Sequence, residues 1–88
     1  MAGRYKVKIR VISQKGICRN EHKVGDEWII EGKTPGGMCP SAWNALHSNV
    51  RVMMLGGSFD WTGDPDMCTV ACPDPDNPLV FEVRRLRE

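Results

Sequence analysis

Hydrophobic and polar residues alternate along several short stretches of this chain, which is the pattern of strands with one buried face. RYKVKIRVIS alternates from Arg4 to Ile12, and LVFEVRRL alternates in the same way later in the chain. EWIIEG is a shorter candidate that ends at Gly32, and VRVMMLGG is the most apolar one. The pattern predicts strands near residues 4–13, 26–31, 50–55 and 79–86, and CTVAC can extend as a further strand.

The segment after Pro40 has a helical pattern, and proline suits the first position of a helix. In PSAWNALH, Ala42, Ala45 and Leu46 form an apolar stripe, which predicts a helix of about two turns at 40–47. His47 would then close this helix, where the helix dipole favours a cation. We therefore expect an α+β fold, with a small, mostly antiparallel sheet of four to five strands and one or two short helices.

The 88 residues are expected to form a single domain, 1–88, since no repeat or low-complexity linker divides them. A chain of this size buries only about 60–65% of its unfolded surface, so a bound metal or a homo-oligomer would add stability. No apolar run approaches the roughly 18 residues that span a membrane. The opening MAGRYKVKIRV has no apolar signal-peptide region, so we expect a cytoplasmic protein.

Charge is distributed unevenly along the chain. Residues 1–23 carry seven Lys or Arg against Glu21 alone, whereas residues 24–78 carry eight acidic residues. Such a basic segment could meet nucleic acid. However, its basic residues alternate with apolar ones, as on any solvated strand face, and Tyr5 is the only aromatic residue among them, so aromatic residues for base stacking are not interleaved with the charges. The pattern therefore argues against nucleic-acid binding.

The four cysteines are the candidate residues for metal binding or catalysis. Thiols stay reduced in the cytoplasm, so they favour metal binding or catalysis over a disulfide scaffold. Thiolates select zinc or iron–sulfur clusters, and four of them suffice for [4Fe–4S]. The spacing is neither the ferredoxin array nor the paired C-x2-C of structural zinc. We predict a cluster, with zinc as second choice, held by Cys18, Cys39, Cys68 and Cys72, with His22 as a further candidate ligand.

Other interpretations of these residues stay open. A disulfide between Cys68 and Cys72 is disfavoured in a strand, where their Cα atoms would be about 13 Å apart and a bridge needs less than about 7 Å. Cys39 could instead be a nucleophile paired with His22 or His47, because a helix N-terminus lowers the pKa of a thiol. His22 could also be a solvent-facing loop residue. Finally, the chain could be a metal-free interaction module that uses Phe59 and Trp61 as an exposed aromatic pair.

Two longer stretches, HKVGDEWIIEGKTPGGMCPSAWNAL and CTVACPDPDNPLVFEVRRL, resemble a family of small uncharacterised bacterial and archaeal proteins. Its members are of similar length, are frequent in anaerobes and sometimes occur as tandem copies. The motifs that carry the resemblance are H-K-V-G-D, G-x-C-P-x-A-W and C-P-D-P, and it extends from about Val7 to Leu86. The family has no assigned activity, and its anaerobic bias is compatible with an oxygen-sensitive cluster.

The motifs of this resemblance point first to Cys39 and Cys72, and then to Cys18 and His22. Cys68 is the cysteine least tied to them; without it, His22, a partner subunit or an outside ligand would complete a three-cysteine site. We therefore expect a small metal-binding protein that holds an iron–sulfur cluster and acts in electron transfer or as a partner of redox enzymes. An enzyme with Cys39 as nucleophile and a metal-free module are the alternatives.

Overall fold

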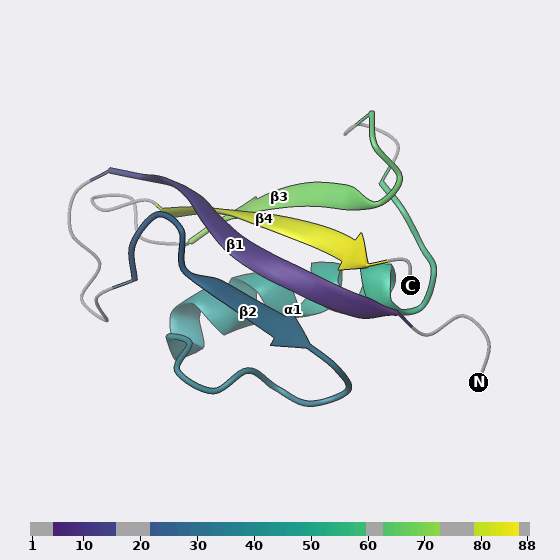
Figure 1. Ribbon diagram of the computed structural model, residues 1–88, viewed down its shortest axis with the longest axis horizontal. Coiled ribbons are helices and arrows are strands. Elements are labelled where there is room, and N and C mark those ends of the chain that lie inside the picture. Colours follow the sequence, from purple (N-terminus) through teal and green to yellow (C-terminus); the bar gives the residue numbers. More distant parts are fainter. Residues whose placement is uncertain (1–4, 16–21, 60–62, 73–78, 87–88) are drawn as a thin grey trace.

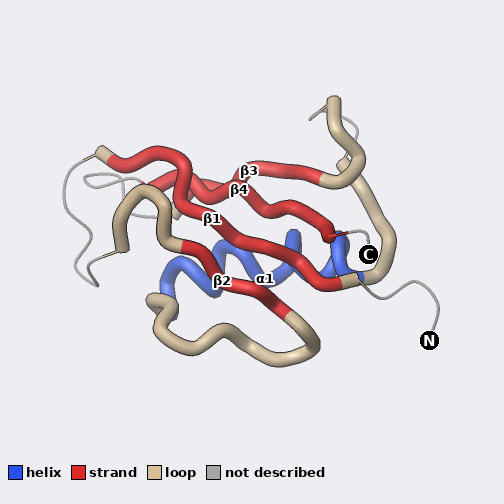
Figure 2. Tube along the Cα trace, in the orientation of Figure 1, coloured by secondary structure: helices blue, strands red, loops and turns tan. Residues whose placement is uncertain are grey.

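The computed structural model describes residues 5–15, 22–59, 63–72 and 79–86. In these residues, a four-stranded antiparallel sheet carries a single helix on one face (Figures 1 and 2). The strand order is β2-β1-β4-β3, so β1 and β4 are central. The α+β prediction is confirmed. The elements are β1 (Lys6–Gln14), β2 (Glu27–Ile30), α1 (Pro40–Met54), β3 (Met67–Ala71) and β4 (Leu79–Leu86).

The two central strands are the ones with the clearest alternation. β1 and β4 pair antiparallel with Ile9 opposite Val83 and Val11 opposite Phe81, which places their apolar side chains on one face. A β-bulge between Val11 and Ser13 shifts the register near the end of β1. The strands predicted near 4–13, 26–31 and 79–86 are thus present, and CTVAC supplies β3.

The strand predicted at 50–55 is wrong, because these residues form the second half of α1. Val50, Met53 and Met54 follow Leu46 at helical spacing, and all four are buried against the sheet. The helix therefore runs to Met54 and not to 47, and His47 lies in its middle. Leu55 is the C-cap, and Gly56 follows with φ 90°, a left-handed conformation that suits glycine after a helix.

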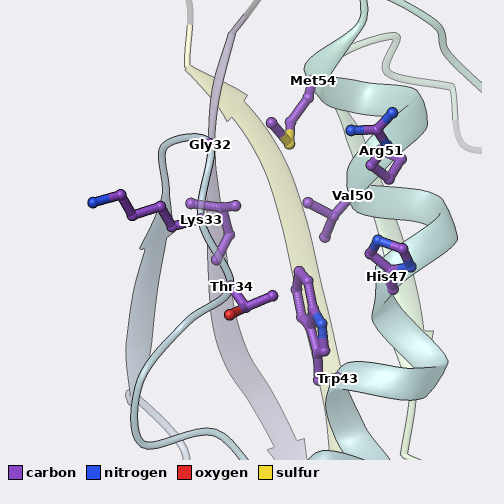
Figure 3. Close-up of a pocket in the computed structure, with 9 residues that line it drawn as sticks. Gly32, Lys33, Thr34, Trp43, His47, Val50, Arg51 and Met54 are labelled. Atoms are coloured by element: carbon purple, nitrogen blue, oxygen red, sulfur yellow. The ribbon is translucent and has the colours of Figure 1, made fainter.

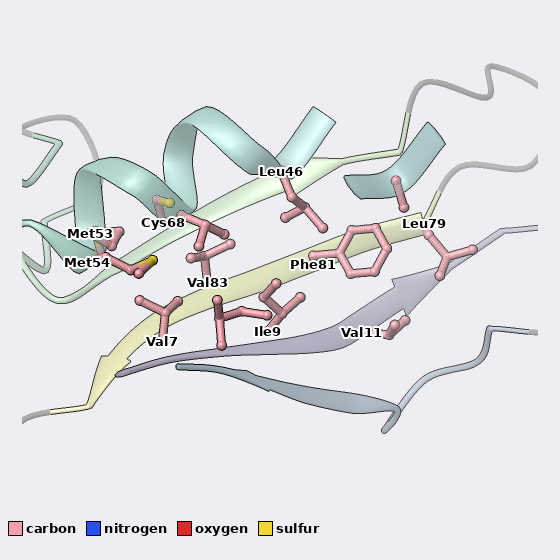
Figure 4. Packing of buried hydrophobic residues seen from close by; sticks show 13 residues of the cluster. Val7, Ile9, Val11, Leu46, Met53, Met54, Cys68, Leu79, Phe81 and Val83 are labelled. Carbon is pink, nitrogen blue, oxygen red and sulfur yellow. The ribbon is translucent and has the colours of Figure 1, made fainter. Parts of the chain in front are cut away.

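The core fills the space between α1 and the sheet (Figure 4). Ile9, Leu46, Met53, Phe81 and Val83 are all fully buried there. Burial of each such side chain contributes roughly 1.5–3 kcal/mol relative to exposure. Packing against the sheet therefore stabilises the helix.

The opposite face of the sheet carries ion pairs across its strands. Lys8 and Arg10 of β1 both approach Glu27 of β2, at 3.8 and 3.7 Å, and Lys6 lies 3.6 Å from Glu31. The positive charge of β1 is thus matched by carboxylates at its neighbours. These side chains are exposed, so each pair contributes at most about 1 kcal/mol.

Arg85 is a buried charge at the end of β4. Its Nε donates to Asp66 Oδ1 at 2.9 Å, and its terminal nitrogens donate to three backbone oxygens. Its guanidinium also lies 5.2 Å from the ring centroid of Tyr5. Arg85 therefore connects β4 to the end of α1 and to the segment before β3. Its three carbonyl partners are those of Met53, Gly57 and Pro65.

Within the described part of the chain, α1 is too short and too polar to cross a membrane.

Candidate functional site

Two of the three described cysteines lie at one end of the sheet. Cys39 is the N-cap of α1, Cys72 directly follows β3, and both are half-buried against the core. Cys68 lies inside β3 and is fully buried. None of these three forms a disulfide bond. Cys18 lies outside the described residues.

A series of hydrogen bonds and one strand pairing connects Cys72 to Cys39. The Cys72 N–H donates to the Leu79 carbonyl at 2.8 Å, and Leu79 pairs with Gln14 across β4 and β1. The Gln14 side chain donates to the His22 carbonyl at 3.2 Å, and the Cys39 N–H donates to His22 Nε2 at 3.0 Å. Figure 1 shows the beginning of α1 and the ends of β1 and β3 on the left of the molecule. We call these five residues the cysteine end.

The H-K-V-G-D motif forms the turn that places His22 there. The Asp26 carboxylate accepts the Lys23 N–H at 3.0 Å, and the Asp26 N–H donates to the Lys23 carbonyl. Gly25 has φ 98°, so the turn needs a residue without Cβ. Its N–H donates to the Val11 carbonyl, which fixes the turn against β1. Gly25 and Asp26 therefore have structural reasons in this turn, whereas Lys23 contributes through its backbone.

His22 is buried, with 5% of its surface exposed, so the interpretation as a solvent-facing residue is wrong. Its ring packs edge-on against Trp28 with centroids 5.1 Å apart, and Trp28 in turn contacts Phe81. Because Nε2 accepts a hydrogen bond, the neutral ring carries its proton on Nδ1. A metal at Nε2 would have to displace the Cys39 amide. His22 is thus a positioning residue for Cys39 in this arrangement.

Cys39 occupies the positive end of the helix dipole. Its backbone is extended, with φ −58° and ψ 134°, and its carbonyl accepts the first helical hydrogen bond from Trp43 at 3.0 Å. Pro40 follows at the first helical position. Partial positive charge at a helix N-terminus favours a thiolate, as either metal binding or nucleophilic chemistry requires.

Cys68 lies apart from the cysteine end. The Asn49 amide donates to its sulfur at 3.8 Å, and Asn49 is about 15 Å along the helix from Cys39 at 1.5 Å per residue. Along the extended strand, Cys68 and Cys72 are about 13 Å apart, too far for a disulfide. Burial raises the pKa of the Cys68 thiol, and the Asn49 hydrogen bond opposes this only partly. The structure therefore gives Cys68 a core position.

The described residues do not form a complete metal site. Among them, no group of three or more His, Cys, Asp or Glu has metal-binding geometry. The potential metal ligands at the cysteine end are two thiols. The Nε2 atom of the His22 imidazole accepts the hydrogen bond from the Cys39 N–H. A four-cysteine cluster that includes Cys68 does not fit this placement.

The catalytic alternative is matched only in part. His22 lies beside Cys39, but its Nε2 accepts the backbone amide and is not free to take a thiol proton. His47 is about 12 Å further along α1 at 1.5 Å per residue, and its ring contacts Trp43 with centroids 5.4 Å apart. Of the predicted aromatic pair, Phe59 is half-buried against the core, and Trp61 lies outside the described residues.

One residue of the cysteine end, and one that packs against it, escaped the sequence prediction. Gln14 holds the His22 carbonyl, and Trp28 supports the imidazole ring. The only sequence signal was the place of Trp28 on the inward side of the β2 alternation. Comparisons with family models, curated proteins and solved structures found no match to this chain.

Proposed function

We propose that this protein binds an iron–sulfur cluster or a single metal ion through the thiolates of Cys39 and Cys72 at the cysteine end. One observation carries the proposal. The two cysteines that precede proline are far apart in the sequence, and the fold brings them to the same end of the sheet. Both are half-buried, and Cys39 has the electrostatic environment that favours a thiolate.

The sequence adds Cys18 as a third thiolate, since it stands four residues before His22, which belongs to this end. Cys68 is left out of the ligand set because of its distance and its burial. With three protein thiolates, a fourth position would be open to a partner subunit, a substrate or an outside ligand. An iron–sulfur cluster would supply one-electron transfer, whereas zinc in the same place would be redox-silent.

The structure suggests what the surrounding residues contribute. His22 and Gln14 fix the backbone at Cys39, and Trp28 and Phe81 form an apolar wall beside the imidazole. Apolar surroundings control solvent access to a metal site and thereby its reduction potential. A cytoplasmic electron carrier, alone or as a homo-oligomer, fits this proposal; sedimentation at high concentration tests the self-association.

The test is anaerobic purification, followed by reconstitution with iron and sulfide, metal analysis and a visible absorption spectrum. We expect a brown protein whose absorption bleaches on reduction, as thiolate-to-iron charge transfer requires. Cys39→Ser and Cys72→Ser should each lose most of the metal. Cys68→Ala is the matched control and should retain it.

Three results separate the alternatives. A colourless wild-type protein without stoichiometric iron or zinc after reconstitution would end the proposal. Equal metal loss in the Cys68→Ala variant, with its fold intact, would overturn the choice of ligands. A single hyper-reactive thiol at Cys39 in an alkylation profile of the metal-free protein would favour the nucleophile interpretation, because the position of Cys39 at the helix N-terminus also suits that role.

A further inference from the structure

A pocket of about 110 Å³ lies between α1 and the connection that follows β2 (Figure 3). Its helix side presents residues at helical spacing, so they share one face. On the other side lies the backbone of the loop that begins at Gly32. The lining residues on the helix are Trp43, His47, Val50, Arg51 and Met54, and those opposite are Ile30, Gly32, Lys33 and Thr34.

The floor of this pocket is apolar. Ile30, Val50 and Met54 are buried, and Trp43 is half-buried. An engineered apolar cavity of about 150 Å³ holds benzene. A pocket of this size that opens to solvent therefore accommodates most of a single ring or a branched aliphatic group.

The rim is positively charged and has no acidic counterpart. No aspartate or glutamate is among the lining residues, and the Arg51 side chain has no hydrogen bond or ion pair to another described residue. The His47 ring lies 5.4 Å from the Trp43 ring, centroid to centroid, and the His47 side chain has no hydrogen bond or ion pair to another described residue. Figure 3 shows the Lys33 ammonium directed away from the helix, so we assign the charge of the rim to Arg51.

A basic side chain without a carboxylate partner does not occur on the two central strands. Every Lys and Arg of β1 and β4 approaches a carboxylate within 4 Å, whether exposed or buried. The rim of the pocket differs from the strands, because the Arg51 guanidinium lies beside an apolar floor and has no carboxylate partner among the described residues. The cationic strand residues are Lys6, Lys8, Arg10, Arg84 and Arg85.

We propose that this pocket binds a small organic carboxylate with one aromatic ring or branched aliphatic group. The apolar part lies on Trp43, Val50 and Met54, and the carboxylate faces the planar guanidinium of Arg51, which matches it in a bidentate manner. His47 supplies a further donor at the rim. The proposal does not depend on metal binding at the cysteine end, because it rests on different residues.

The test is a titration of the ¹⁵N-labelled full chain with benzoate, followed by NMR. Benzyl alcohol and benzylamine serve as probes with the same ring and a neutral or positive substituent. We expect saturable shifts at the Gly32 and Thr34 amides and at the Trp43 indole N–H with benzoate. Benzyl alcohol should bind at least a few-fold more weakly, and benzylamine more weakly still. Equal binding of all three probes, or no saturable shift with benzoate at millimolar concentrations, overturns the proposal.

A pair of variants tests the role of the rim. Arg51→Gln removes an exposed charge without disturbing the helix, and should weaken benzoate binding about two- to fivefold, as expected for an exposed ion pair. Lys23→Gln removes an unpaired charge elsewhere on the surface and should leave the affinity unchanged. If both variants bind benzoate like the wild type, Arg51 is not the partner of the carboxylate and the proposal fails.

Discussion

Replacement of Arg85 by alanine should be among the most damaging single changes in this chain. The Arg85 side chain is 1% exposed and makes four hydrogen bonds, at 2.9 Å to the Asp66 carboxylate and at 3.0, 2.7 and 2.6 Å to the carbonyls of Met53, Gly57 and Pro65. Arg85→Ala removes all four donors at once and leaves the carboxylate and the buried carbonyl of Met53 without this partner.

The expected loss follows from measured cases. Removal of one partner from a buried ion pair costs about 3–5 kcal/mol. A chain of 88 residues has a free energy of unfolding of roughly 4–13 kcal/mol, so this loss is a large part of the total. Arg85→Lys keeps the charge but cannot reach partners in several directions, and we expect an intermediate loss of about 2 kcal/mol.

Arg84 provides a matched control, because it is the adjacent residue and faces the opposite side of β4. Its contacts with Glu82 and Asp64, both at 3.3 Å, are partly exposed, so Arg84→Ala should cost less than about 1 kcal/mol. Urea denaturation followed by circular dichroism measures both variants. If Arg85→Ala lost less than about 1 kcal/mol, or no more than Arg84→Ala, the role given to the buried guanidinium would be refuted.

Three further predictions concern the core and the cysteine end. Because burial raises the pKa of Cys68, the folded state holds the thiol proton more tightly than the unfolded state, in which the thiol has its ordinary pKa of 9.0. The free energy of unfolding should therefore be full below pH 9.0 and fall above it, and Cys68→Ala should flatten this part of a pH series of urea midpoints. Val50→Ala should cost about 1–3 kcal/mol because Val50 is buried, whereas Val52→Ala, two residues on and exposed, should be nearly neutral; the opposite order in thermal denaturation would contradict the helix at 50–54. His22→Phe keeps a ring against Trp28 but leaves the Cys39 N–H without its acceptor, so a loss of about 1–3 kcal/mol is expected, and an unchanged urea midpoint would show that the hydrogen bond to Cys39 is unimportant.

The strands could be predicted from sequence where one face is buried and the other is solvated. β1 and β4 meet this condition, and their alternation placed them almost correctly. In VRVMM the residues are apolar at nearly every position, so the segment satisfies strand and helical spacing alike. The helix is distinguished from a strand only because the buried residues of this segment continue the buried face of α1 that includes Leu46.

The candidate site was harder to predict because its contacts join distant segments. Cys39 and Cys72 were singled out from their prolines, but nothing local indicates that His22 accepts the Cys39 amide, since the two lie in different loops. Cys68 looked like a ligand beside Cys72, and the extended strand separates them. Arg85 had a signal that was missed: it continues the inward-facing series of Phe81 and Val83, where a charge needs a buried partner.

The pairing of β1 with β4 has a consequence for synthesis of the chain. The centre of the sheet joins the first strand to the last, with Lys6 opposite Leu86 and Val11 opposite Phe81. A ribosome that has released β1, β2 and α1 has therefore made only half of the layer on which the helix packs. The apolar faces of β1 and α1 therefore stay exposed to solvent, or bound by a chaperone, until β4 has been synthesised. Contacts between segments far apart in sequence form late in folding. Folding of this protein is thus expected to follow the completion of β4, with little stable structure gained before it.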